Sequence, residues 1–215
     1  MFKRKNALEE PSRRYSLDAP FEIVEAYNSL VSNLLRICSD KGYKSIGITS
    51  ASYGEGKSTV AIDLANALAD NLINKRILLV DSDLRRSSVS TVMCNDDIKG
   101  LSNFLADDSS DPGIIKTDID NLDLLSAGDV KANPTGLLRS DKMGEVLSRL
   151  EAVYDFIIID TPPVNDYADA LFLADRVSGF LFTAKKKVST VSSLDVATSR
   201  METSGATILG IVYSE

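Results

Sequence analysis

Residues 49–59 carry a sequence that is typical of a phosphate-binding loop. The segment reads TSASYGEGKST and follows the pattern G-x-x-x-x-G-K-[ST], with Ala51 in place of the first glycine. Glycines in such a loop let backbone N–H groups approach one phosphate closely. We expect Lys57 to reach the β- and γ-phosphates of a nucleotide and the Ser58 hydroxyl to ligate Mg²⁺. The expected nucleotide contacts are Ser52, Tyr53, Gly54, Glu55, Gly56, Lys57, Ser58 and Thr59.

Carboxylates follow two apolar segments further along the chain. Asp81 and Asp83 come after RILLV, and Asp160 comes after FIII. The carboxyl ends of parallel strands meet at one edge of a sheet, where ligands bind, so we expect these acids beside the phosphate loop. Mg²⁺ prefers oxygen ligands. The predicted metal site consists of Ser58, Asp81, Asp83 and Asp160.

Two arginines follow the first pair of carboxylates. We expect Arg85 to offset the charge that develops on a transferred phosphate, with an ion pair at a helix start or an exposed partner contact as the alternative role. The predicted catalytic residues are Lys57, Asp81, Asp83, Arg85 and Asp160.

The composition narrows the chemistry that is available. The chain contains no histidine, which excludes Ser-His-Asp and Cys-His catalysis and metal sites built on imidazole. Carboxylates, lysine, arginine, hydroxyls and backbone amides remain. With 24 Lys plus Arg against 31 Asp plus Glu, the formal net charge of −7 argues against general nucleic-acid binding. Two cysteines make no disulfide framework, so we expect a cytoplasmic protein.

The spacing of apolar residues predicts strands that alternate with helices. Predicted strands cover residues 45–49, 76–81, 122–126, 156–160, 180–184 and 208–213. Predicted helices cover residues 21–39, 58–72, 101–105, 136–153, 167–177 and 189–203. Residues 136–153 form either one helix or two helices that meet at Ser140. This alternation indicates an α/β fold, a single P-loop domain with a mostly parallel sheet and helices on both faces. We expect a flexible N-terminal arm at residues 1–20 and the domain at residues 21–215. The apolar runs are far shorter than the roughly 20 residues that a membrane-spanning helix needs.

Four segments resemble those of one known family. The segments TSASYGEGKST, ILLVDSDLRR, LDLLSAGDVKANPTGLL and FIIIDTPPV occur in this order. Together they are similar to the bacterial tyrosine kinases (BY-kinases) of capsule and exopolysaccharide synthesis, within the deviant P-loop ATPase group. The similarity covers residues 22–214 and implies transfer of the ATP γ-phosphate to protein tyrosine, with Mg²⁺. It also implies that Asp81 and Asp83 serve Mg²⁺ and activation of the tyrosine hydroxyl, and that Asp160 lies near Mg²⁺.

The same resemblance implies partners and a location. The family acts with a membrane-bound polysaccharide co-polymerase that serves as activator, and it phosphorylates a protein tyrosine acceptor. A cytoplasmic position at the inner face of the cell membrane, reached through that partner, follows from the resemblance. A homo-oligomer is an option, although Glu25, Asn28 and Val31 stand where the family often has Glu-x-x-Arg-x-x-Arg.

Two alternative functions remain open from the sequence. Family members usually carry a C-terminal tyrosine cluster, whereas Tyr213 is the only tyrosine after Tyr167 here. That difference favours a nucleotide-binding regulatory partner of the polysaccharide machinery with little kinase activity. The other alternative is a partition-type P-loop ATPase, a class that often has a second lysine where this sequence has Ser52.

Overall fold

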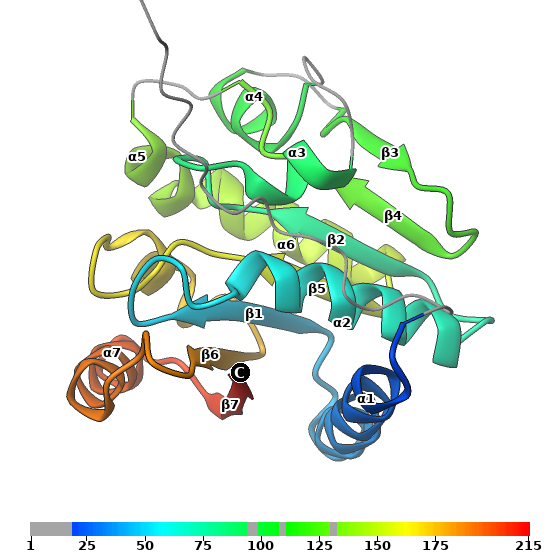
Figure 1. Cartoon of the computed structure of the whole chain (residues 1–215). Coiled ribbons are helices and arrows are strands. Elements are labelled where there is room, and N and C mark those ends of the chain that lie inside the picture. Colours follow the sequence, from blue (N-terminus) through cyan, green and yellow to red (C-terminus); the bar gives the residue numbers. More distant parts are fainter. Residues whose placement is uncertain (1–18, 94–98, 108–110, 130–132) are drawn as a thin grey trace, which may run out of the picture.

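The computed structural model describes residues 19–93, 99–107, 111–129 and 133–215. The strands are β1 (Ser45–Ser50), β2 (Ile77–Asp81), β3 (Ile114–Lys116), β4 (Leu122–Leu125), β5 (Phe156–Asp160), β6 (Gly179–Lys185) and β7 (Ile208–Ser214). The helices are α1 (Phe21–Lys41), α2 (Lys57–Asn71), α3 (Ser88–Met93), α4 (Leu101–Ala106), α5 (Pro134–Arg139), α6 (Asp141–Val153), the 3₁₀-helix η1 (Asp169–Leu173) and α7 (Val191–Thr203). Figure 1 shows the strands as a central twisted layer flanked by helices.

The strands form one sheet in the order β3-β4-β2-β5-β1-β6-β7. Every neighbouring pair is parallel except β3 with β4, which is antiparallel. One apolar core packs α1, α2 and α3 on one face of the sheet. The other core packs α4, α5, α6, η1 and α7 on the opposite face. The predicted α/β domain with a mostly parallel sheet and helices on both faces is therefore confirmed.

The central strands are buried on both faces, as their composition requires. Every residue of β1 and β2 is buried, and β5 is buried after its first residue. Parallel strands covered by helices on both sides read as continuous apolar runs, which is why ILLV and FIII show no alternation. In β1, an added Cβ at Gly47 would lie 2.2 Å from a ring carbon of Phe180, so the β6 phenylalanine packs directly on the glycine.

Most predicted elements are present with small shifts in their ends. The predicted helix 136–153 is two helices, because Ser140 takes an extended conformation between α5 and α6. The predicted helix 167–177 is wrong in type and length, since only the short 3₁₀-helix η1 forms there. Neither β3 nor α3 is predicted from the sequence. Both are very short, and α3 is rich in serine, a residue that favours helix ends over helix interiors.

The order of the strands brings three chain segments together at one edge of the sheet. Since β5 lies between β2 and β1, the segments that leave the carboxyl ends of these strands are neighbours (Figure 1). Asp160 at the end of β5 is the ladder partner of Asp81 on one side and of Ile48 on the other. Parallel α/β sheets bind ligands at this edge.

Some expectations concern parts that the structure does not describe. The predicted arm at residues 1–20 lies outside the described residues except for its last two positions. Within the described ranges, every helix is too short or too polar to serve as a membrane span. Cys38 is a buried free thiol, and Cys94 lies outside the described residues.

Candidate active site

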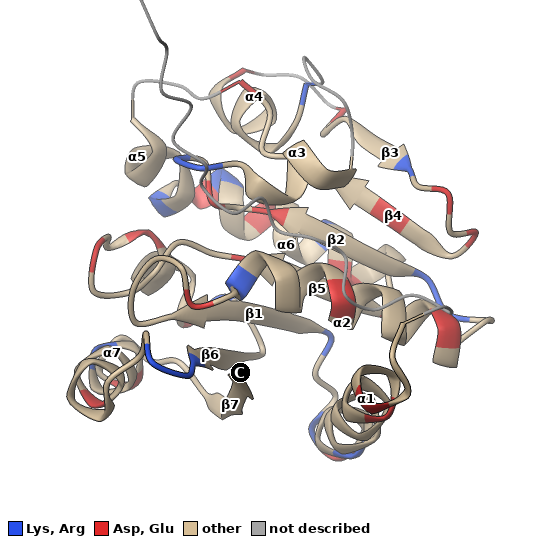
Figure 2. Cartoon of the chain, in the orientation of Figure 1, with Lys and Arg blue, Asp and Glu red and all other residues tan. Residues whose placement is uncertain are grey.

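The loop between β1 and α2 has the conformation of a phosphate-binding loop. Gly54 and Gly56 have φ angles of 80° and 83°, in the left-handed region that glycine adopts without steric cost. The loop runs directly into α2, whose first residues are Lys57 and Ser58. The first N–H groups of a helix lack partners within the helix, and the helix dipole is positive there, so this end attracts anions. Figure 2 shows a basic segment at the start of α2 beside an acidic one in the preceding loop.

Glu55, the acidic residue of the loop, stabilises the conformation of the loop backbone. Glu55 is 1% exposed, and its Oε2 accepts a hydrogen bond from the backbone N–H of Ser52 at 2.9 Å. The Ser50 hydroxyl donates to the carbonyl oxygen of Ser52 at 2.7 Å. The backbone at Ser52 is therefore held from both sides. The side chain of Glu55 shapes the loop, while the predicted nucleotide contact of this residue stays a prediction.

Aromatic rings surround the lysine of the loop. Lys57 is buried, and its Nζ lies 5.2 Å from the ring centroid of Tyr53. The ring of Tyr53 meets Tyr167 edge-on at a centroid distance of 5.9 Å and also carries the guanidinium of Arg86 at 4.3 Å. The Tyr53 hydroxyl oxygen is buried without a hydrogen-bond partner among the described residues. Its burial and the nearby Asp83 carboxylate raise the pKa of Tyr53.

Ser58 and two aspartates meet at the end of the central strands. The Ser58 hydroxyl donates to Asp160 Oδ2 at 2.6 Å. Asp81 Oδ2 accepts from the backbone N–H and the hydroxyl of Ser90 at 3.0 and 2.9 Å. The remaining oxygens, Asp81 Oδ1 and Asp160 Oδ1, are buried, and no described residue donates a hydrogen bond to either of them. Unpaired buried carboxylate oxygens are costly unless a cation satisfies them.

The crowding of carboxylates shifts their acidity. Burial is the main cause that raises the pKa of Asp160 to about 7, while Lys57 and Ser58 oppose the shift. Burial, and then the charge of Asp160, raise the pKa of Asp81 well above its usual range. Burial also raises the pKa of Asp83, against the opposing charge of Lys57. A divalent cation at this place would favour the ionised forms of all three groups.

The donor set fits a hard cation that keeps part of its water shell. In the part of the chain that the structure describes, no three carboxylates or thiols gather closely enough to hold a metal by themselves. Mg²⁺ is commonly bound through one or two carboxylates together with water and substrate phosphates. The Ser58 hydroxyl and the unpaired oxygens of Asp81 and Asp160 match that pattern, so these residues could hold Mg²⁺ with a nucleotide.

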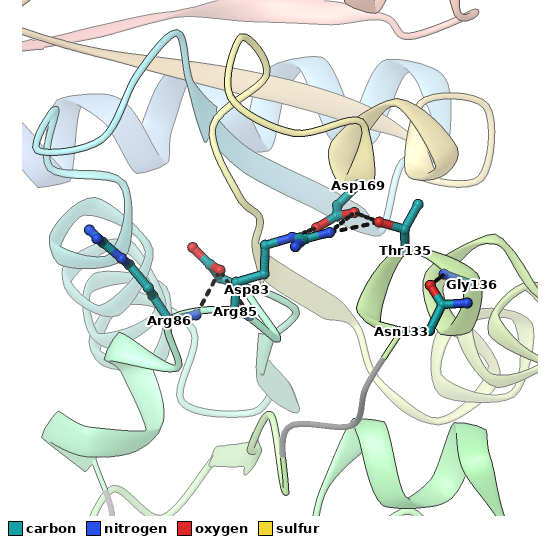
Figure 3. Close-up of polar contacts among 7 residues, drawn as sticks. All are labelled: Asp83, Arg85, Arg86, Asn133, Thr135, Gly136 and Asp169. Carbon is teal, nitrogen blue, oxygen red and sulfur yellow. Dashed lines mark hydrogen bonds and ion pairs between the residues drawn. The ribbon is translucent and has the colours of Figure 1, made fainter.

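The loop after β2 holds Asp83 and turns the two arginines in different directions (Figure 3). Asp83 Oδ1 accepts from the backbone N–H of Arg86 at 3.1 Å and of Arg85 at 3.3 Å. The guanidinium of Arg85 pairs with Asp169, at a distance of 2.6 Å from Nε to Oδ2. Asp169 begins η1, so the geometry matches the ion pair at a helix start that was the alternative role for Arg85. The offset of phosphate charge by Arg85 stays a prediction.

The structure gathers most of the predicted site and adds residues that the sequence did not single out. Lys57, Ser58, Asp81, Asp83 and Asp160 converge at the edge of β2, β5 and β1, with Tyr53 over Lys57, whereas the partly exposed Thr59 lies in the first turn of α2. The added residues are Ser90, Thr135, Tyr167 and Asp169. An acid shortly after the FIIID segment could have been noticed as a partner for the arginines. Thr135 lies in the segment LDLLSAGDVKANPTGLL, which carries part of the family resemblance, whereas Ser90 has no comparable signal.

Comparisons with known proteins agree on the fold and on one family. Residues 43–178 match a family model described as an AAA domain. The tyrosine-protein kinase CpsD of Streptococcus agalactiae serotype III (strain NEM316) is 34% identical over 193 residues, which are 89% of this chain and 82% of the relative.

Solved structures point the same way. The kinase domain of the Escherichia coli tyrosine kinase ETK has a TM-score of 0.82 and 27% identity, covering 97% of this chain and 86% of that domain. The septum site-determining protein MinD from Pyrococcus horikoshii OT3, complexed with Mg-ADP, has a TM-score of 0.67 and 28% identity, covering 79% of this chain and 69% of that protein. The greater similarity to kinases does not favour the regulatory or partition-type alternatives.

Proposed function

This chain belongs to the bacterial tyrosine-protein kinase family, and from that premise we propose that it transfers the γ-phosphoryl group of ATP to tyrosine hydroxyls of proteins. The biological setting of the proposal is the synthesis or export of capsular polysaccharide or exopolysaccharide. Similarity to CpsD over most of both chains supports it.

The phosphate loop and the start of α2 provide the nucleotide site of this proposal. Backbone N–H groups of residues 52–59 surround the phosphates, and Lys57 places its ammonium group on the β- and γ-oxygens. For Lys57 to do so, its ammonium leaves the face of the Tyr53 ring, where it lies at 5.2 Å. The exchange replaces a cation–π contact by a pairing with anionic oxygens, which is stronger.

Ser58, Asp81 and Asp160 would hold Mg²⁺ in this proposal. Bound Mg²⁺ supplies electrostatic stabilisation of the phosphate oxygens during transfer. In the structure the Ser58 hydroxyl donates to Asp160. To ligate a metal, the hydroxyl has to rotate so that a lone pair of its oxygen faces the ion. Ser90 keeps one oxygen of Asp81 fixed meanwhile.

Asp83 is the residue that faces the acceptor. The oxygen of the acceptor phenol attacks the γ-phosphorus, the bond to the β-phosphate oxygen breaks, and ADP leaves. The phenol has a pKa near 10, so its proton moves to the Asp83 carboxylate only as the new bond forms. The backbone N–H groups of Arg85 and Arg86 occupy Oδ1 of Asp83, which leaves Oδ2 for the acceptor.

One observation carries the assignment more than any other. The Ser58 hydroxyl at the start of α2 lies 2.6 Å from Asp160 at the end of β5, beside two buried carboxylate oxygens that lack partners in the described ranges. Oxygens that can bind a cation, at the end of a phosphate-binding loop, support the proposal. Metal-assisted phosphoryl transfer requires that combination.

The proposal extends to partners and location. A membrane-bound polysaccharide co-polymerase acts as the activator and recruits the chain to the cytoplasmic face of the cell membrane. Protein tyrosines are the acceptors, and self-association into a homo-oligomer belongs to the proposal as well. The formal net charge of −7 argues against nucleic acid as a general partner.

Transfer of radiolabel tests the function directly. Purified protein is incubated with γ-³²P-ATP, Mg²⁺ and a random copolymer of glutamate and tyrosine, and the product is hydrolysed for phosphoamino-acid analysis. We expect label on tyrosine with the wild type and none with Lys57→Met, because the charge on the β- and γ-phosphates is lost. Bound ATP without phosphotyrosine, also in the presence of the cytoplasmic tail of a co-polymerase, would contradict the kinase function and support the regulatory alternative.

A further inference from the structure

The Arg85 side chain lies at the centre of a partly buried polar cluster formed by Arg85, Thr135 and Asp169 (Figure 3). Nε and Nη2 of Arg85 donate to Oδ2 and Oδ1 of Asp169 at 2.6 and 3.3 Å. Nη2 also donates to the Thr135 hydroxyl at 2.7 Å, and that hydroxyl donates to Asp169 Oδ1 at 2.6 Å. Each member of this three-residue cluster therefore contacts both others.

The three-residue cluster joins segments that are far apart in the sequence. Arg85 belongs to the loop after β2, Thr135 to the first turn of α5, and Asp169 to the start of η1. Thr135 and Asp169 are separated from Arg85 by 50 and 84 positions. The N-cap of α5 is fixed independently, because the Asn133 side chain accepts from the backbone N–H of Gly136 at 3.0 Å. Arg85 is thus anchored to two segments that are distant from it in the sequence.

The charge of Arg85 is already compensated inside the protein. The Asp169 side chain is completely buried, and hydrogen bonding to it raises the pKa of Arg85 further. If the guanidinium turned toward a substrate phosphate, it would leave a buried carboxylate without a counter-charge, which is strongly unfavourable. Arg86 differs, because its side chain is exposed and makes no ion pair with any carboxylate in the described part of the chain.

The backbone of the same residue holds the acid that faces the acceptor. The N–H groups of Arg85 and Arg86 both donate to Asp83 Oδ1. The position of the Arg85 backbone therefore bears on the orientation of the Asp83 carboxylate.

We propose that Arg85 is a positioning residue, and that Asp169 and Thr135 act through it to fix the Asp83 carboxylate for phosphoryl transfer. The inference rests on the proposed kinase function for its kinetic consequence. A positioning role and a direct role of Arg85 on the substrate phosphate predict opposite changes in the rate of phosphoryl transfer. Under a direct role, loosening Asp169 or Thr135 would free the guanidinium and leave transfer unchanged or faster. Under positioning, the same change slows transfer.

Thr135→Val tests the inference with little change in side-chain volume. We expect kcat for phosphorylation of the glutamate–tyrosine copolymer to fall about tenfold, the scale of one hydrogen bond to a charged group. The KM for Mg-ATP should stay near its wild-type value, because the phosphate loop is untouched. Arg85→Lys combined with Thr135→Val should be no slower than Arg85→Lys alone. The matched control is Thr203→Val in α7, where the hydroxyl donates only to the Ser199 carbonyl oxygen of its own helix.

A second measurement is independent of activity. Amide hydrogen exchange at Arg85 should be faster in Thr135→Val than in the wild type or in Thr203→Val, because the Arg85 N–H donates to Asp83 Oδ1 and that hydrogen bond becomes less constrained. Unchanged exchange, or an unchanged or increased kcat in Thr135→Val, overturns the inference. If the wild type forms no phosphotyrosine, the proposed function fails, while the exchange at Arg85 still decides whether Arg85 positions Asp83.

Discussion

Asp160→Asn should stabilise the nucleotide-free protein while it removes activity. Asp160 is completely buried, and the protein environment raises its pKa from the ordinary 3.8 to about 7. A difference of this size corresponds to about 4 kcal/mol between the protonated and the ionised form. Asparagine imitates the protonated acid, and its side-chain oxygen can still accept the hydrogen bond from Ser58. The variant therefore avoids most of the cost of a buried charge.

The sign of the pH dependence follows from proton linkage. Between about pH 4 and pH 7 the folded wild type holds a proton on Asp160 that the unfolded chain has lost, so its stability falls as the pH rises. Below pH 4 both states are protonated and the contribution vanishes. The stability of Asp160→Asn relative to the wild type should therefore grow by about 1.4 kcal/mol per pH unit over this range and then become constant.

Urea unfolding at a series of pH values, with EDTA and without nucleotide, measures this difference. Asp155→Asn is the control, since hydrogen bonds from Arg76 and Lys75 lower the pKa of the partly exposed Asp155 and its replacement should not stabilise the protein. Addition of Mg-ADP should stabilise the wild type much more than Asp160→Asn. A stability difference that does not depend on pH, or a less stable variant at pH 8, would refute the reasoning.

Two further substitutions test the packing around the site. Tyr53→Phe removes a buried hydroxyl oxygen that has no partner among the described residues, so the free energy of unfolding should rise by up to about 1 kcal/mol, and a clear decrease in urea unfolding would show that the hydroxyl is satisfied. Gly47→Ala places a Cβ 2.2 Å from the Phe180 ring and should cost about 1–3 kcal/mol, with thermal unfolding as the measurement. The matched change Gly144→Ala, in α6, meets no described atom within 4 Å and should stabilise the helix by about 0.5–1 kcal/mol; equal effects of both alanines would contradict the packing.

The local parts of the site could be predicted because each of them is encoded in a continuous segment. The phosphate loop needs only a strand, a Gly-rich turn and a helix start in sequence, and TSASYGEGKST supplies all three. The acids Asp81 and Asp160 could be placed at strand ends because ILLV and FIII are buried on both faces. The general rule for parallel sheets then places them at a common edge.

The remaining parts depend on tertiary contacts that no local pattern contains. The position of β5 between β2 and β1, which makes Asp81 and Asp160 ladder partners, is a property of the sheet order. The partner of Arg85 lies 84 positions away, and its hydroxyl support on Thr135 lies 50 positions away. The helix predicted at residues 167–177 from the spacing of apolar residues does not form. The segment contains the short 3₁₀-helix η1, whose first residue, Asp169, is buried and pairs with Arg85.

The contact between Lys57 and Tyr53 shows a further limit of the sequence. Tyr53 could be assigned to the loop, but the contacts of Lys57, Arg86 and Tyr167 with its ring depend on three separate segments. This cluster of rings and cations surrounds the lysine that the nucleotide needs. Any account of nucleotide affinity in this chain therefore has to include the displacement of Lys57 from the ring.

Phosphotyrosine formation by the wild type and by Asp83→Asn, with nucleotide affinity measured on the same samples, tests the central claim most directly. If Asp83 is the general base of a tyrosine kinase, the wild type forms phosphotyrosine on the copolymer. The rate of phosphotyrosine formation by Asp83→Asn should then be lower by a factor of about 10²–10⁴, the usual contribution of a positioned general base. This role of Asp83 also predicts similar binding of Mg-ATP by both proteins. Full activity of Asp83→Asn, or ATP binding by the wild type without any phosphotyrosine, would contradict it.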